Sequence, residues 1–451
     1  MMNQIYTIFS LLLLVCINSY GQESKKWTLE ECMAYAVENS PRTNKQIAQN
    51  IIHQQDYIEA IGRLLPNIGA GTSAEYNYGR IVDEETNTYT NANSFSNYYS
   101  LYSSITLFDG LSSINRIRMQ KANKLMGKEQ LQSTKDMVAY ETMESFFLVL
   151  YSAEIVKLAE QQLEESSANH RQVKRMEELG VKGASDVAEM AAKEAADNYN
   201  LTRQRNIHTI NLIKLKEKMN YPIDEELGIA HSYSNNSVIR STEHASQIFE
   251  YAKEYNPKAV AAELALRSQE LNLKAAKGAY LPTITAEGGY YTSFSKYLDG
   301  SVFIPFSEQL KGKRRQYFGF SLSVPIFSRF SRSATVNRSK AQVVIAQNEE
   351  AEALRSLYSE IEQAVADKNG QADEYNQAQK QSESMSIAHK VNQRKYEEGL
   401  ISALELHTSS NRLVQAMAEE MNSKLKYELK LRLVEYYKGV PFISENRRQT
   451  E

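Results

Sequence analysis

Cysteine is nearly absent from the 451-residue sequence, which contains only Cys16 and Cys32. Because Cys16 lies in an N-terminal apolar segment that we expect to be removed, the mature chain keeps one thiol and forms no internal disulfide. Proline and glycine are also scarce, with 8 and 19 residues. Since both residues interrupt helices and strands, the sequence predicts long uninterrupted elements.

The sequence has no excess of one charge, with 52 Lys and Arg against 55 Asp and Glu. This balance argues against a nucleic-acid binder, which normally carries a basic face. After the N-terminus, no apolar run approaches the roughly 20 residues that a membrane-spanning helix needs. The mean hydropathy of -0.51 and the hydrophobic content of 42% exclude both a polytopic helical membrane protein and a disordered chain.

Motifs for catalysis and for metal binding are also missing. The sequence contains no phosphate-binding Walker loop, no HExxH and no CxxC. Its seven histidines stand singly along the chain, at His53, His170, His208, His231, His244, His389 and His407. We therefore expect no enzyme activity, no cofactor and no metal site.

The N-terminus carries a short apolar segment at residues 8–17 (IFSLLLLVCI), followed by the small residues of SYG. This pattern predicts a signal peptide over residues 1–21. The usual basic start is missing, because the first Lys or Arg is Lys25. Two alternatives stay open: a buried N-terminal helix, and a lipid anchor on Cys16, although Val15 stands where a lipoprotein signal has a small residue.

An internal repeat organises the rest of the chain. Four motifs recur in the same order: YAVENSP at 35–41 with YAKEYNP at 251–257, LLPNIGA at 64–70 with YLPTITA at 280–286, TLF at 106–108 with PIF at 325–327, and ELGVKGASDV at 178–187 with EGLISALEL at 398–406. The first two pairs are separated by 216 positions (251 minus 35) and the last two by 219 (325 minus 106, and 399 minus 180 for the two tip glycines). The chain is therefore a tandem duplication. Its parts are a first repeat at 22–222, a linker at 223–242, a second repeat at 243–437 and a tail at 438–451.

Each repeat contains two segments in which apolar and polar residues alternate, as they do in one-sided strands. We expect strands at about 67–80 and 97–108 in the first repeat, and at about 283–293 and 316–326 in the second. Strands of this length can cross a bilayer when tilted, and tyrosines near their ends would suit an interfacial aromatic belt. Those tyrosines are Tyr76, Tyr78, Tyr98, Tyr99, Tyr290, Tyr291 and Tyr317. A soluble sheet is the alternative.

Long segments with scarcely a Gly or Pro follow each strand pair, at residues 111–179 and 331–398. Apolar residues in them recur at spacings of three and four, which predicts packed helices. A second long helix follows each turn, so each repeat ends in an antiparallel hairpin closed near Gly180 or Gly399. Four strands cannot close a barrel in lipid, and either two or three protomers would satisfy closure.

With these motifs, the sequence resembles the TolC family of outer-membrane efflux proteins over essentially the whole mature chain. The motifs are WTLEECMAYAVENSP (27–41), LLP and YLP before the first strand of each repeat, TLFDG (106–110), PIF, and the Gly-centred tips. The resemblance implies an α+β membrane protein in the outer membrane of a Gram-negative bacterium. It implies a homotrimer, with four strands per chain in a 12-stranded β-barrel and the helices in a periplasmic α-barrel. The function implied is a passive exit duct, in contact with outer-membrane lipid, that works with a periplasmic adaptor protein and an inner-membrane pump.

The resemblance also assigns a gate to the hairpin tips. In the family an acidic residue follows the tip Gly by six positions, which corresponds to Asp186 and Glu405, and the closed state has a tyrosine, here Tyr396, bonded to Asp186. This sequence departs from the pattern because it has Glu405 in place of Asp, and Thr408 where the family has an acid, so we expect a different cation-selecting ring. A simpler role for both carboxylates is to interact with a helix N-terminus.

Contact with the adaptor is assigned to four tip residues, Gly180, Val181, Gly399 and Leu400, because exposed apolar residues at the end of a hairpin require a partner. A simple stop between two helices explains the glycines equally well. The alternative function is a structural or adhesive coiled-coil protein anchored by a trimeric barrel.

A basic cluster precedes the fourth strand, where we expect an extracellular loop. It consists of Lys311, Lys313, Arg314 and Arg315. The cluster either contacts lipid phosphates or, more simply, forms a solvated loop.

Overall fold

The computed structural model describes residues 26–82, 87–91, 93–230, 238–240, 242–299 and 302–443. The expected signal peptide and parts of the expected linker and tail lie outside this range. The chain divides into two compact units. Unit 1 comprises the described residues of Met1–Ile47, Gln130–Ala259 and Leu354–Glu451, and unit 2 those of Ala48–Glu129 and Val260–Ala353. Within the described ranges, no helix combines the length and apolar character needed to cross a membrane.

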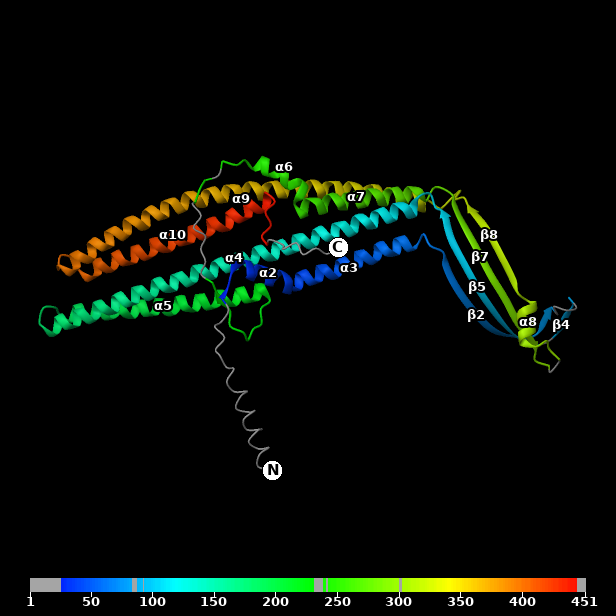
Figure 1. Cartoon of the computed structure of the whole chain (residues 1–451), viewed down its shortest axis with the longest axis horizontal. Helices are drawn as coiled ribbons and strands as arrows, with labels where there is room; N and C mark the ends of the chain where they lie inside the picture. Colours follow the sequence, from blue (N-terminus) through cyan, green and yellow to red (C-terminus); the bar gives the residue numbers. More distant parts are fainter. Residues whose placement is uncertain are drawn as a thin grey trace, which may run out of the picture. The chain divides into compact units, whose positions relative to one another are not determined.

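Two 67-residue helices, α4 and α9, contribute residues to both units (Figure 1). The described helices are α2 (Leu29–Asn39), α3 (Pro41–Gly62), α4 (Ser112–Glu178), α5 (Ala184–Met219), α6 (Ala245–Tyr255), α7 (Pro257–Gly278), α8 (Phe306–Gly312), α9 (Ser331–Glu397) and α10 (Ala403–Tyr437). The described strands are β1 (Lys26–Trp27), β2 (Asn67–Asn77), β3 (Arg80–Val82), β4 (Tyr89–Asn91), β5 (Ser94–Phe108), β6 (Gly228–Ile229), β7 (Thr283–Tyr297) and β8 (Arg315–Ser323).

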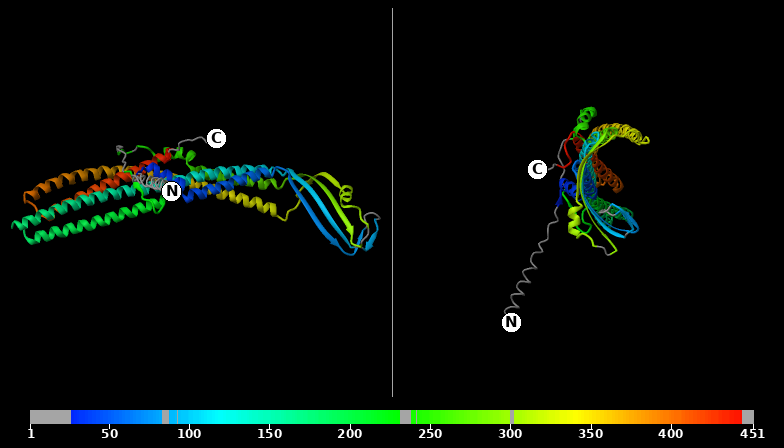
Figure 2. Two further views of the ribbon diagram at one scale, coloured as in Figure 1. Left: turned by 60° about the horizontal axis from the view of Figure 1, so that its bottom comes forward. Right: turned by 90° about the vertical axis from the view of Figure 1, so that its right-hand side faces the viewer.

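Unit 2 contains a four-stranded antiparallel sheet with the strand order β2-β5-β7-β8 (Figures 1 and 2). Its four strands are those expected from the alternating segments, and β2 and β8 form its edges. Strand β8 ends at Ser323, before the expected end at residue 326. Because Pro325 has no N–H to donate, the ladder of hydrogen bonds cannot continue through it.

The two faces of this sheet differ in chemistry. Opposite residues in the register share a face. The apolar face carries Ile68, Ala70, Thr72, Ala74, Tyr76, Phe95, Tyr99, Leu101, Ile105, Ile284, Ala286, Tyr290, Phe294, Phe318, Phe320 and Leu322. Among the strand residues of this face, Lys296 at the end of β7 is the one that carries a charge. Glu75, Glu287 and Arg315 lie on the opposite, polar face, which confirms the alternation expected from the sequence.

The aromatic belt expected from the tyrosines is wrong in part. Tyr98, Tyr291 and Tyr317 lie on the polar face, where the Tyr98 hydroxyl donates to Glu75 Oε1 at 3.0 Å. Successive residues of a strand point to opposite faces of the sheet. A tyrosine near a strand end can therefore lie on either face, and its place in the alternation decides which one.

The duplication is visible in the register of the strands. In the first hairpin Ala70 lies opposite Leu101, and in the second hairpin Ala286 lies opposite Phe320. These residues are related by the offsets found in the sequence, 216 (286 minus 70) and 219 (320 minus 101). The two repeats therefore form the same hairpin with the same pairing.

A close backbone approach joins the end of α7 to the turn before α4 in unit 2. Gly110 has a φ of +68°, and a Cβ at this position would lie 2.2 Å from the carbonyl oxygen of Gly278. Any side chain at Gly110 would therefore clash with backbone, and its positive φ also favours glycine.

Unit 1 has a core formed by α2, α4 and α5. The helical stripe expected from the sequence lies in this core, since Met143, Phe146, Phe147 and Leu150 are all buried. Leu215 from α5 joins them and is fully buried. Apolar burial of this kind supplies the main favourable free energy that holds long helices together.

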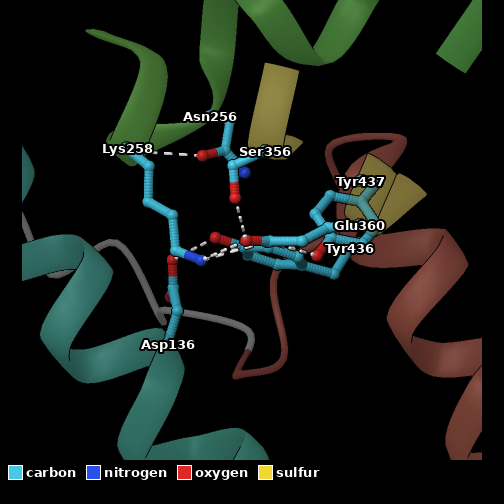
Figure 3. A network of polar contacts seen from close by, with 7 residues as sticks. All are labelled: Asp136, Asn256, Lys258, Ser356, Glu360, Tyr436 and Tyr437. Atoms are coloured by element: carbon cyan, nitrogen blue, oxygen red, sulfur yellow. Dashed lines mark hydrogen bonds and ion pairs between the residues drawn. The ribbon is translucent and has the colours of Figure 1, made fainter. Parts of the chain in front are cut away.

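A second cluster in unit 1 brings charged side chains together with two tyrosines (Figure 3). Glu360 on α9 lies 3.0 Å from the ammonium of Lys258 and accepts a hydrogen bond from the Tyr437 hydroxyl at 3.1 Å. The Tyr436 hydroxyl donates to Asp136 Oδ2 at 2.8 Å. Burial, and then the neighbouring carboxylates, raise the pKa of both tyrosines, which therefore stay neutral donors.

Three elements of the fold have no strong sequence signal. The short β3–β4 hairpin follows β2, the helix α8 separates β7 from β8, and β1 pairs in parallel with β6 across some 200 residues (228 minus 26). Each element is too short to show a period, and pairings distant in sequence depend on tertiary contacts.

We predict that Met143→Ala lowers the free energy of unfolding by about 2–5 kcal/mol, because it leaves a cavity beside a fully buried side chain. The measurement is the urea midpoint of helical circular dichroism in detergent. Leu148→Ala on the same helix is the control, since Leu148 is 53% exposed. An equal loss in both variants would contradict the placement of the core.

Candidate functional site

Both hairpins of unit 1 are closed by the same C-terminal helix motif. At the first tip, Gly180 has a φ of +73°, and its N–H donates to Glu177 O at 2.8 Å. The Val181 N–H donates back to Met176 O at 2.8 Å. This pair of bonds is the Schellman motif, which requires a left-handed residue and so explains the glycine.

The second tip repeats this geometry. Gly399 has a φ of +75°, its N–H donates to Tyr396 O at 2.9 Å, and the Leu400 N–H donates to Lys395 O at 2.8 Å. The Tyr396 carbonyl accepts the bond from Gly399, so Tyr396 belongs to the last turn of α9. The expected hairpin tips therefore lie at Gly180 and Gly399.

The two acidic residues assigned to the gate cap the helices that follow the tips. The Gly183 N–H donates to Asp186 Oδ2 at 3.1 Å. Glu405 accepts from the Ser402 N–H at 3.2 Å, while the Glu405 N–H donates to Ser402 Oγ at 3.2 Å. Both carboxylates thus interact with a helix N-terminus, which is the simpler of the two roles considered for them.

Apolar side chains are exposed around both tips. The exposed fraction is 79% for Leu179, 70% for Val181, 68% for Leu400 and 59% for Leu404. Thr408, one turn further along α10, is exposed and donates to the carbonyl of Leu404 at 2.8 Å.

Tyr396 lies half-buried between the two hairpins, in a small cavity lined by Met190, Lys193 and His407. Burial, and then the charge of Asp186, raise the pKa of the Tyr396 hydroxyl. Asp186 is therefore near Tyr396, although its carboxylate is bonded to the Gly183 N–H in this structure. The hydroxyl remains protonated and able to donate near neutral pH.

Next to the tips, a layer of polar contacts joins the two hairpins. Gln162 of α4 donates to Asn411 Oδ1 of α10 at 2.5 Å, and the Asn411 amide lies 3.0 Å from His407 Nε2. Glu165 of α4 accepts from the Ser410 hydroxyl at 3.1 Å and lies 3.6 Å from His389 Nε2. Polar side chains from three helices, α4, α9 and α10, therefore meet here.

Sequence reasoning missed this layer. It treated His389 and His407 as isolated residues, because the α4 residues near them lie more than 200 positions earlier in the chain. Glu165 precedes His389 by 224 positions (389 minus 165). Gln162, which is connected to His407 through Asn411, precedes it by 245 positions (407 minus 162). The available signal was the place of His407 beside Ser410 and Asn411 on a helix expected to pack in a hairpin. In the part of the chain that the structure describes, no cluster of His, Cys, Asp and Glu could hold a metal ion.

The layer also contains His407, whose protonated form would destabilise the folded state. Burial, and then the neighbouring Lys193, lower the pKa of His407, while Asp197 raises it. Lys193 and Asp197 form an ion pair at 2.5 Å whose side chains are 10% and 6% exposed. Neutral His407 is therefore the form compatible with this environment.

We predict that unit 1 loses stability as pH falls below about 6.5, the ordinary pKa of histidine. The folded pKa of His407 is lowered, so the unfolded chain binds the proton more tightly and stability is lost as pH falls toward that folded value. Urea midpoints at pH 7.5 and 5.5 measure the loss, and His407→Gln should reduce it. His53→Gln in unit 2 is the control, and an unchanged pH dependence in the His407 variant would contradict this prediction.

Comparison with known proteins agrees with the fold. Residues 249–433 match the family model of outer membrane efflux proteins. The chain is similar to the solved structures of the CmeC outer membrane channel of Campylobacter jejuni (TM-score 0.77, 16% identity, 93% of this chain and 87% of that chain covered) and the MtrE outer membrane channel of Neisseria gonorrhoeae (0.75, 18%, 94% and 91%). It is also similar to the outer membrane protein VceC of Vibrio cholerae (0.75, 12%, 92% and 96%). A search of curated protein sequences gave no match.

These structural similarities establish the fold of the chain, and the family match covers most of the second repeat. The expectation of a TolC-like protein is thereby confirmed, as are the outer-membrane location and a role other than that of an enzyme. Residues 249–433 therefore form a domain of the outer membrane efflux protein family.

Proposed function

We propose that this protein is the outer-membrane exit duct of a tripartite efflux or secretion system, and that it works as a homotrimer. The observation that carries the proposal is the four-stranded sheet, with an apolar face, a polar face and two unpaired edges. In lipid the N–H and C=O groups of β2 and β8 need partners, and other copies of the chain can supply them. Three copies give a closed barrel of twelve strands, lined by the polar face.

The internal repeat predicts how the copies would pair. Strand β5 is the second sheet strand of the first repeat, and it pairs with β7, the first sheet strand of the second repeat. The equivalent contact between copies joins β8 of one protomer to β2 of the next. Because Tyr102 lies opposite Gly289 in the β5–β7 register, the offsets of 219 and 216 place Ser321 opposite Ser73 of the neighbouring copy.

Exposed backbone and apolar surface beside β2 and β8 support the same contact between copies. The close approach of Gly110 and Gly278 has an equivalent pair, Arg329 and Gly62, at the same offsets (110 plus 219, 278 minus 216). A Cβ added at Gly62 would have no atom within 4 Å. Arg329 has a φ of +50°, in the same left-handed region as Gly110. Phe330 beside it is 77% exposed, as expected for a surface that a second copy covers.

The hairpin tips would form the periplasmic end of the duct. There the exposed residues Val181 and Leu400, with Gly180 and Gly399, would contact the adaptor, which links the duct to the inner-membrane pump. Tyr396 would donate to Asp186 in the closed state and release it when the adaptor shifts the hairpins, since a phenol-to-carboxylate bond is strong but exchangeable.

Two further exposed groups would line the same constriction. Glu405 and Thr408 stand on the first turns of α10, next to the second tip. One carboxylate and one hydroxyl per chain form a weaker cation-selecting ring than two carboxylates.

We predict that Ser321→Cys combined with Ser73→Cys, in a Cys32→Ala background, forms a disulfide between neighbouring copies. Directly opposite strand residues lie within the Cα separation that a disulfide needs. Non-reducing electrophoresis should show a covalent trimer that reduction dissolves. The control pairs Ser321→Cys with Asn77→Cys, four residues along β2 and roughly 13 Å away. Cross-linking of the control pair alone would refute the register, and a monomer in both would refute the oligomer.

We predict that Tyr396→Phe raises the conductance of the protein in a planar bilayer, because it removes the hydroxyl that would hold the tips closed. Tyr375→Phe, on the same helix α9 further from the tip, should leave conductance unchanged. Equal conductance of the Tyr396 variant and the unaltered trimer would count against the closed-state bond. Absence of any pore would overturn the duct itself.

A further inference from the structure

Helix α8 lies at the free end of β7, at the far end of the strand from α7 (Figures 1 and 2). Strand β8 pairs with β7 only as far as Tyr291, so the last residues of β7 have no strand beside them on that edge. The side chain of Gln309, which is buried, takes the place of a strand there. It accepts from the Ser295 N–H at 3.0 Å and donates to the Ser295 carbonyl at 2.8 Å.

Aromatic contacts fix the segment before α8 and its first turn on the apolar face of the sheet. The ring of Phe306 lies 5.2 Å from that of Phe294 and 6.2 Å from that of Tyr99, and Phe303 lies 6.0 Å from Phe294. Phe294 and Tyr99 are both residues of the apolar face. Under the proposed function, on which this inference rests, that face contacts lipid, so α8 is at the outer rim of the lipid-facing surface.

The surface of this segment is both apolar and basic. Val302 is 102% exposed and Ile304 is 47% exposed, just before the helix. Lys311 and Arg314 are exposed at its end, whereas Lys313 is half-buried and Arg315 lies on the polar face of the sheet. Between residues 302 and 316, Glu308 is the one acidic residue against four basic ones. Lys296, the single charge on the apolar face, lies 6.0 Å from the Phe303 ring and adds to the same positive region.

We propose that α8 and the segment before it, residues 302–315, form a binding site for phosphate-bearing anionic lipids of the outer leaflet. Exposed Val302 and Ile304 would enter the acyl region, where an apolar side chain gains free energy by leaving water. The cations would hold the headgroup phosphates, since lysine and arginine bind phosphate as charge-assisted donors. A solvated loop explains the cations, but it does not explain fully exposed apolar residues beside them on a lipid-facing surface.

The pairing of Gln309 with Ser295 gives the site its position. Lys313 also donates to Ser295 Oγ at 2.7 Å, and the Thr292 hydroxyl donates to the Leu310 carbonyl at 2.7 Å. These bonds attach the C-terminal half of α8 to β7, and the ring contacts of Phe306 hold its first turn. The site is therefore held on a strand and is not a free loop, which reduces the ordering cost of binding.

The test titrates the detergent-solubilised full-length trimer with bisphosphorylated lipid A, followed by native mass spectrometry. Monophosphorylated lipid A, with the same acyl chains, is the comparison probe. We expect tighter retention of the bisphosphorylated form, and a loss of roughly tenfold to thirtyfold in Lys311→Gln combined with Arg314→Gln. The control is Arg338→Gln combined with Lys340→Gln, which removes the same charge from exposed positions on α9. Equal retention in the two double variants would overturn the proposal.

Two further arms separate the possible outcomes. Val302→Ser combined with Ile304→Ser should also weaken retention, and an unchanged affinity would overturn the lipid contact. Inorganic phosphate in millimolar excess should not displace the lipid, whereas full displacement would identify a free-anion site and refute the proposal. Conductance of the same samples is measured in a planar bilayer. A pore with unaltered lipid retention in the α8 variant refutes only the lipid site, whereas the absence of a pore refutes the duct.

Discussion

The constraint on which the structure depends is that backbone N–H and C=O groups must be paired wherever water cannot reach them. A sheet of four strands with an apolar face cannot meet this constraint alone, because β2 and β8 each leave one edge open. The same constraint acts at smaller scale on β7, whose last residues extend beyond β8. There a glutamine side chain, Gln309, supplies the donor and the acceptor that a strand would have supplied.

Because the chain is duplicated, the contacts between its two repeats indicate how copies of the chain would pair. The contacts between the two repeats inside one chain are β5 with β7 and Gly110 with Gly278. Their counterparts at the outer ends of the chain are exposed, with Phe330 and the edge of β8 on one side and Gly62 and the edge of β2 on the other. A head-to-tail contact of this kind forms rings when the rotation closes.

In unit 1, the two helical hairpins are held together near their tips by contacts of a different kind from those in the core. Its apolar core around Met143 lies away from the tips, while the contacts next to the tips are polar. Polar contacts such as Glu165 with Ser410 have a smaller net free energy than a fully packed core and can exchange partners. This arrangement suits the proposed opening of the tips.

The sequence by itself determined the duplication, the four strands and their faces, the bounds of the long helices and the glycine turns. These features depend on local rules: a period of two or 3.6 residues, a positive φ that only glycine adopts readily, and recurrence at a fixed offset. Only the tertiary structure decided that His407 meets Gln162 through Asn411, and that α8 lies beside β7. Those features depend on register and on partners distant in the chain, and no local pattern specifies which distant residue will fill a given space.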